Sequence, residues 1–159
     1  MRKLTALTDF IIKATGVPRE NFAAFIDQGD LQPIGRHLGL LSGENGEPDR
    51  EQIEVGFWKY DALIQIERYD GDGPTLAAQV LGWLQTFDPD RADLALPQLD
   101  VHLNDGKTCD CDISCEFEEV LTAIEDENGP IHFGGKRWKL EDLEIVPVES
   151  FTMHGRIKG

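Results

Sequence analysis

Hydrophobic and polar positions follow their most regular pattern between residues 53 and 89. From Trp58 to Glu67 apolar side chains occupy every second position and mostly polar ones lie between them, which predicts a β-strand with one buried face. After the turn-forming run 70–74, apolar residues recur at helical spacing from Leu76 to Phe87, and Asp88-Pro89 ends that helix. An amphipathic helix directly after a half-buried strand most simply packs on it, so we expect the core here.

The N-terminal third predicts a helix, a strand and a loop. Apolar residues at helical spacing between Leu4 and Ala14 predict a helix that Gly16 ends. Alternation from Phe22 predicts a strand that Gly29 bends or ends. Residues 31–41 are ambiguous, because their proline opposes a central strand and their glycines weaken a helix. The turn formers that follow predict a mobile loop over residues 42–52.

The C-terminal half predicts mostly strands. Residues 99–103 alternate as a strand, residues 104–107 turn, and a long strand runs to residue 124 with a β-bulge near residues 118–119. Residues 126–140 are predicted as a hairpin arm, residues 143–148 as a last strand and residues 150–159 as a basic tail. One face of the long strand is apolar and the other is acidic. The apolar positions are first Cys109, Cys111, Ile113, Cys115 and Phe117, and beyond the bulge they move by one residue to Val120, Thr122 and Ile124.

Together these elements predict a single α+β domain over residues 1–149, followed by the tail. We expect a mainly antiparallel or mixed sheet of about five strands, with two main helices packed on one face.

Composition narrows the classes of partner. The 159 residues carry 30 acidic and 15 basic side chains, a formal net charge of −15, which opposes binding to free nucleic acid and to anionic membranes. No apolar run is long enough for a membrane span, and we expect no secretion signal. Three cysteines in such a chain then indicate reduced thiols in a cytoplasm.

No motif predicts catalysis, a metal or a cofactor. The three cysteines lie at odd-numbered positions along one strand face. We expect them to be too far apart for one tetrahedral ion without other ligands, and buried thiols are the simpler interpretation. Asp110, Asp112 and Glu116 are expected on a solvated strand face. The nucleophile-elbow, phosphate-loop and dinucleotide motifs do not occur. Trp138, among basic residues, is either a core anchor or an exposed interface anchor.

Several segments share hydrophobic patterns with a known protein family: Phe25-Ile26-Asp27-Gln28-Gly29, residues 60–70, Val80-Leu81-Gly82-Trp83-Leu84-Gln85, Pro89-Asp90, residues 99–103 and residues 111–124. In these segments, which cover most of residues 1–125, the chain resembles the tail completion protein R (GpR) family of contractile-tailed bacteriophages. The resemblance implies a non-enzymatic tail completion or terminator protein at the head–tail joint. Such a protein forms a homo-oligomeric ring, contacts tail tube or connector proteins, and is found in the bacterial cytoplasm during assembly and then in the virion tail.

In such a ring, a basic arm of one subunit can dock on the acidic face of the next. The alternative from a different class is a small cytoplasmic enzyme or ligand-binding domain that uses the acidic strand, which a deep pocket with perturbed carboxylates would favour. The candidate interface residues are Phe133, Trp138, Phe151, Met153 and Arg156 on the basic side, and Asp110, Asp112 and Glu116 on the acidic side.

Overall fold

The computed structural model describes residues 1–141, 145 and 147, and it is an α+β fold with a six-stranded antiparallel sheet and two α-helices. Contacts between Cα atoms divide the chain into two compact units. The helical unit comprises Met1–Gln28, Tyr60–Phe117 and Ile145–Gly159, and the strand unit comprises Gly29–Lys59 and Glu118–Glu144. Three strands, β1, β2 and β4, contribute residues to both units.

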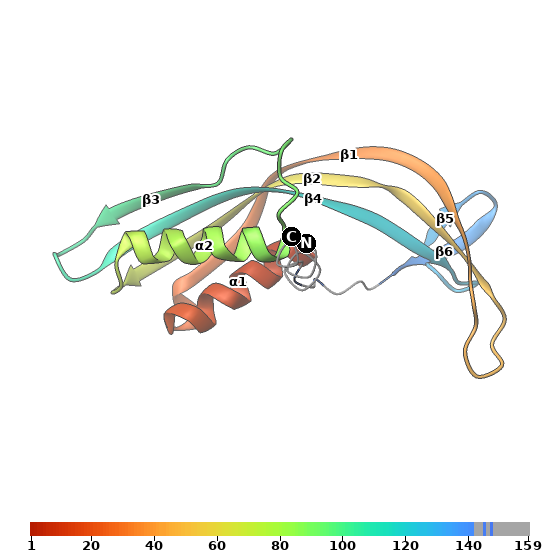
Figure 1. Cartoon of the computed structure of the whole chain (residues 1–159), viewed down its shortest axis with the longest axis horizontal. Helices are drawn as coiled ribbons and strands as arrows, with labels where there is room; N and C mark the ends of the chain where they lie inside the picture. Colours follow the sequence, from red (N-terminus) through yellow and green to blue (C-terminus); the bar gives the residue numbers. More distant parts are fainter. Residues whose placement is uncertain (142–144, 146, 148–159) are drawn as a thin grey trace, which may run out of the picture. The chain divides into compact units, whose positions relative to one another are not determined.

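Figure 1 labels the elements in chain order. They are α1 (Arg2–Thr15), a short 3-10 helix (Arg19–Asn21), β1 (Phe22–Leu41), β2 (Arg50–Tyr69), α2 (Gly73–Phe87), β3 (Gln98–Leu103), β4 (Cys109–Glu125), β5 (Ile131–Phe133) and β6 (Lys136–Leu140). The sheet order is β1-β2-β4-β6-β5, and β3 pairs antiparallel with β4 through the register Gln98↔Ser114 to Leu103↔Cys109.

Both predicted helices are confirmed, and local sequence explains their ends. Gly16 follows α1 in the left-handed conformation (φ 69°), and its N–H donates to the Ile12 carbonyl at 3.0 Å. Asp72 precedes α2, and its Oδ1 accepts the Thr75 N–H at 3.3 Å, while Pro74 occupies the first turn. The two helices contact each other and cover one face of the strands in the helical unit (Figure 1).

The helical unit buries one face of β2 and β4, as the alternation predicted. The Tyr60 and Phe117 rings lie 5.9 Å apart, and Trp83 of α2 meets Phe117 at 6.4 Å, so helix and sheet share an aromatic centre. The predicted face of β4 is confirmed from Cys109 to Phe117. The buried strand residues are Tyr60, Ala62, Ile64, Ile66, Tyr69, Cys109, Cys111, Ile113, Cys115 and Phe117.

The strand unit has a smaller core around one side chain. Trp138 is 1% exposed and packs with Ile53 and Ala123. Its Nε1 donates to the Phe133 carbonyl at 2.9 Å, which satisfies the indole inside this core. Gly129 in the predicted turn lies so close to the Trp138 backbone that a Cβ would stand 2.1 Å from the Trp138 carbonyl oxygen, so the turn requires glycine.

Several boundaries differ from the predictions. Residues 31–41 are strand, because β1 is an edge strand, where Pro33 breaks no ladder that the sheet requires. The loop ends at residue 49, because Arg50 already begins β2, and the sheet has six strands rather than five.

Burial on β4 also departs in part from the predicted shift. It changes parity between Glu119, which is itself buried, and Thr122; Ala123 is buried next, while Val120 and Ile124 are only partly covered. The predicted last strand at 143–148 lies outside the described residues, apart from residues 145 and 147, which belong to no helix or strand.

Candidate interaction surfaces

The acidic face of β4, formed by Asp110, Asp112, Ser114 and Glu116, is partly exposed, as expected. The β3–β4 register places the Asp100 carboxylate directly opposite Asp112. Like charges opposite each other across two strands cost roughly 0.2–1 kcal/mol. A cationic partner would relieve the repulsion between these two carboxylates.

Asp110 is the most constrained carboxylate of this face. Its Oδ1 accepts the backbone N–H of Arg68 at 3.0 Å and the Asn104 side-chain amide at 3.1 Å. The Arg68 N–H, and then the Asn104 amide, lower the pKa of the Asp110 carboxyl below its ordinary value. Asp110 is thus held as an anion at the surface.

Glu116 is less free than the sequence suggested, because it fixes the connector after α2. Its Oε1 accepts the Ala95 N–H at 3.0 Å, and its main-chain carbonyl accepts Arg91 Nη2 at 2.8 Å. A side chain predicted only as a solvated anion therefore also orders residues 91–95.

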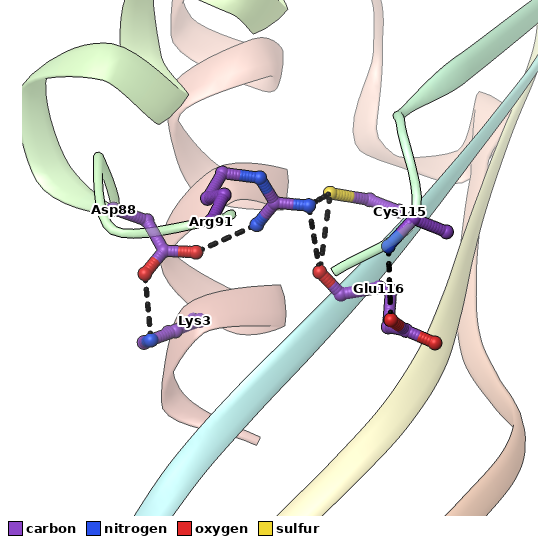
Figure 2. A network of polar contacts seen from close by, with 6 residues as sticks. Lys3, Asp88, Arg91, Cys115 and Glu116 are labelled. Atoms are coloured by element: carbon purple, nitrogen blue, oxygen red, sulfur yellow. Dashed lines mark hydrogen bonds and ion pairs between the residues drawn. The ribbon is translucent and has the colours of Figure 1, made fainter. Parts of the chain in front are cut away.

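Sequence reasoning missed the Asp88 cluster, which Figure 2 shows: Lys3, Asp88 and Arg91. Asp88 is buried, and its two carboxylate oxygens accept Lys3 Nζ and Arg91 Nη1, each at 2.7 Å. Arg91 also lies over the Phe117 ring, 5.5 Å from its centroid. The cluster joins α1, the end of α2 and β4 within the helical unit. Asp88-Pro89 had signalled only the end of a helix.

An open groove of about 290 Å³ lies beside Glu116 in the helical unit. Asp27, Asp61 and Glu116 contribute carboxylates, and Leu96 contributes an exposed apolar side chain. A shallow groove with this lining suits a basic, partly apolar side chain of a protein partner better than a substrate sealed from water.

In the strand unit, the structure decides between the two alternatives for Trp138: it is a core residue. Phe133 is half-buried, with its ring 6.4 Å from that of Trp138. Lys136 Nζ lies 3.0 Å from Glu51 and 3.5 Å from Glu125, and the Glu51 hydrogen bond raises the pKa of Lys136. Charge of the predicted arm is thus partly neutralised within its own unit.

The remaining basic-side candidates, Phe151, Met153 and Arg156, lie outside the described residues.

The cysteines pack as buried thiols. Cys109 Sγ and Cys111 Sγ are 3.7 Å apart, so the prediction that the sulfurs lie too far apart for one ion is wrong for this pair. Burial raises the pKa of Cys111 to about 12 and that of Cys115 to about 11. Both stay protonated at neutral pH, and a protonated buried thiol is a poor nucleophile and a poor metal ligand.

Residues 1–141, 145 and 147 contain no cluster of three or more His, Cys, Asp or Glu that could hold a metal ion. Within the same part of the chain, no helix combines the length and hydrophobicity needed to cross a membrane.

The least expected surface is β1. Its 20 residues include several large apolar side chains, but none of them is buried. Leu31 and Leu40 are the most exposed of these. An apolar face of a strand is buried only where another layer covers it, and the sequence alone did not show how little of β1 the described residues cover.

Sequence comparisons relate the chain to bacteriophage proteins. The sequence model of the family described as P2 phage tail completion protein R (GpR) matches residues 1–142. A protein described as an uncharacterized 19.2 kDa protein in the rep-hol intergenic region of Haemophilus phage HP1 (strain HP1c1) is 28% identical over 160 residues, which cover 96% of this chain and 89% of that protein. No solved structure matches the chain. The family match covers every helix and strand from α1 to β6.

Proposed function

Because the chain belongs to the P2 phage tail completion protein R (GpR) family, we propose that it acts in virion tail assembly as a non-enzymatic protein at the joint between tail and head. The family resemblance predicted from the sequence is confirmed, and the observation that carries the proposal is the match over residues 1–142. Its partners are tail tube or tail–head connector proteins. It works in the bacterial cytoplasm during assembly and remains in the virion tail.

The chemistry of the described residues agrees with a non-enzymatic role. Backbone N–H donors of Lys107 and Thr108 lower the pKa of Asp105, as the Arg68 N–H does for Asp110. A general acid or base near neutral pH needs a shift in the opposite direction. These carboxylates instead remain permanent charges, which suits a protein interface.

We further propose that the protein forms a homo-oligomeric ring. A formal net charge of −15 and the acidic face of β4 favour contact with a basic segment. The sequence supplies one at residues 150–159, with Phe151, Met153 and Arg156. A head-to-tail contact between this tail and the acidic face of the next copy closes by rotation.

Gene deletion tests the role in the tail. We expect that deleting this gene from the phage or prophage genome that carries it abolishes infectious particles and leaves heads and tails unjoined in electron micrographs. A plasmid copy of the wild-type gene should restore joined virions. Normal virions without the gene would overturn the proposed function.

Truncation tests the proposed tail contact separately. Deleting residues 150–159 should lower the oligomer mass in light scattering, because it removes the basic segment proposed for the contact. Circular dichroism checks that the truncated chain still folds. The triple variant Asp110→Asn, Asp112→Asn, Glu116→Gln should give the same loss, and more strongly at low salt. Unchanged assembly in both variants would exclude the tail and the acidic face as contacts.

A further inference from the structure

Among the described residues of the helical unit, no further strand pairs with either edge of the sheet. The strands of this unit run in the order β1-β2-β4-β3, with residues 22–28 of β1 at one edge and β3 at the other. An edge strand presents unpaired backbone N–H and C=O groups, which form a template for another strand.

The register shows which β3 groups face outward. The Asn104 N–H donates to the Thr108 carbonyl at 3.1 Å, and this pair continues the β3–β4 register. In antiparallel strands hydrogen-bonded pairs alternate with non-hydrogen-bonded pairs. His102 and Asp110 therefore form a hydrogen-bonded pair, while the backbone groups of Val101 and Leu103 point away from β4.

Both edges lack the strongest protecting residues, although each carries one aspartate, Asp27 or Asp100. Natural edge strands are blunted by lysine, proline or bulges. β3 and residues 22–28 contain neither lysine nor proline. Both expose large apolar side chains instead: Leu103 is 81% exposed, Val101 40% and Phe25 43%. Exposed apolar side chains beside unpaired backbone groups are a feature of surfaces that another chain covers.

We infer that β3 of one copy pairs antiparallel with residues 22–28 of β1 in a second copy, so that the sheet of the helical unit continues from subunit to subunit. This pairing rests on the self-assembly proposed above and adds a backbone contact to the proposed contact of the tail with the acidic face. It uses two different edges of the chain, so it is heterologous and repeats from copy to copy.

Strand direction and charge both fit a second copy as the occupant. Neighbouring strands of the sheet are antiparallel, so copies in the same orientation bring β3 against an oppositely directed β1. The start of β1 then lies opposite the end of β3. Arg19, an exposed cation, precedes β1, and the Asp105 carboxylate follows β3. Arg19 pairs with Asp9 at 3.5 Å within its own chain. Because this ion pair is exposed, it competes only weakly with a contact between Arg19 and Asp105 of the next copy.

Val101→Pro tests the backbone contact. It removes an outward N–H and leaves the bonds between β3 and β4 intact, so the monomer should keep its circular dichroism spectrum and thermal midpoint. Self-association measured by sedimentation should weaken about tenfold or more. Val101→Thr keeps the N–H and should associate like the wild type. If Val101→Pro sediments like the wild type, the pairing is wrong.

Leu103→Asp tests the same edge without proline. The new charge at this exposed position should block association as strongly as Val101→Pro. Leu81→Asp is the matched control, since Leu81 is 47% exposed but lies on α2, away from the β3 edge, and it should leave association unchanged. Equal effects of the two aspartates would overturn the assignment to this edge.

Mixing variants distinguishes the heterologous pairing from a symmetric one. Phe25→Asp damages only the β1 edge and Val101→Pro only the β3 edge, so each variant alone should be monomeric. Their equimolar mixture keeps one intact pair of edges and should give a 1:1 dimer that does not grow further. Dimerisation of Val101→Pro alone would overturn the pairing in favour of β1 with β1.

Sedimentation of the wild-type chain tests whether the protein self-associates, which is the premise of this pairing. A wild-type chain that stays monomeric in these runs overturns both this pairing and the proposed ring, whereas the role in tail assembly is judged independently by gene deletion.

Discussion

The two units bury their apolar side chains in different ways. In the helical unit, α1 and α2 lie on a strand face that is buried along most of β2 and β4, and the Asp88 cluster ties the helices to the sheet. In the strand unit, the core cluster of buried residues is Ile53, Ala123 and Trp138, and the ion pairs of Lys136 are exposed. One core is spread over many side chains, and the other depends on a single tryptophan.

The difference predicts where the fold is sensitive. A layered core of helix on sheet removes a whole face from water, so a buried charge there has no route to solvent. A core centred on one large side chain loses most of its packing when that side chain is removed. Exposed pairs and half-exposed carboxylates contribute little in either unit.

The largest expected effect is that of Cys115→Asp in the helical unit. A carboxylate would replace a buried thiol, and burying an ion costs several kcal/mol, enough to unfold an ordinary domain. Cys115→Ala keeps the position apolar and should remain folded. Circular dichroism and urea titration distinguish the two, and a fully folded Cys115→Asp protein would contradict the buried-face assignment.

Trp138→Ala should be next and should act on the strand unit. Truncation removes the centre of its core and should cost about 3–5 kcal/mol of unfolding free energy. Leu140→Ala on the same strand is the control, because Leu140 is exposed and should change stability by about 0.5 kcal/mol or less. Hydrogen exchange should place the loss within residues 29–59 and 118–141. Equal losses for the two variants would show that the tryptophan is not the central packing residue.

Asp88→Asn should have an intermediate effect. Both cations of the cluster would lose their counter-charge in a largely buried setting, and we expect a loss of about 2 kcal/mol, below the range for completely buried pairs. Asp9→Asn is matched in chemistry but breaks only the exposed pair with Arg19, so it should cost about 0.5 kcal/mol or less. If chemical denaturation gives equal values for the two variants, the cluster does not stabilise the helical unit.

Asp112→Asn should have a small effect. It changes a half-exposed side chain, so stability should shift by about 0.5 kcal/mol or less, and removal of the repulsion with Asp100 favours a gain. Urea denaturation at low salt measures the sign of the change in unfolding free energy. A large loss would mean that Asp112 has a structural role that the register does not reveal.

The Asp110 carboxyl should contribute a small pH dependence. Its pKa is lowered in the folded chain, so its contribution is present above the unfolded pKa and is lost as pH falls through the folded value. Asp110→Asn should therefore lower stability slightly at neutral pH, where this contribution is present, leave strongly acidic pH unchanged, and flatten the acid limb of the stability curve. An NMR titration that gives Asp110 an ordinary or raised pKa would contradict the two hydrogen bonds assigned to it.

The sequence by itself determined the elements whose signals are local. The periodicity of α1 and α2, the Gly16 and Asp72 caps, and the alternation that buries Cys109 to Phe117 each depend on residues a few positions apart. The family resemblance could be recognised for the same reason, since it follows these hydrophobic patterns. The placement of Asp110, Asp112 and Glu116 on one face of β4 also followed from the two-residue period of a strand.

Only the tertiary structure decided which strand lies at an edge and which side chains meet at long range. Residues 31–41 were ambiguous because an edge strand tolerates Pro33 and exposed leucines, and edge position depends on pairing with the rest of the sheet. Trp138 had two equal interpretations until its partners Ile53 and Ala123 were known. Lys3 and Asp88 are 85 positions apart, and no local pattern records a contact that forms only when distant elements pack together.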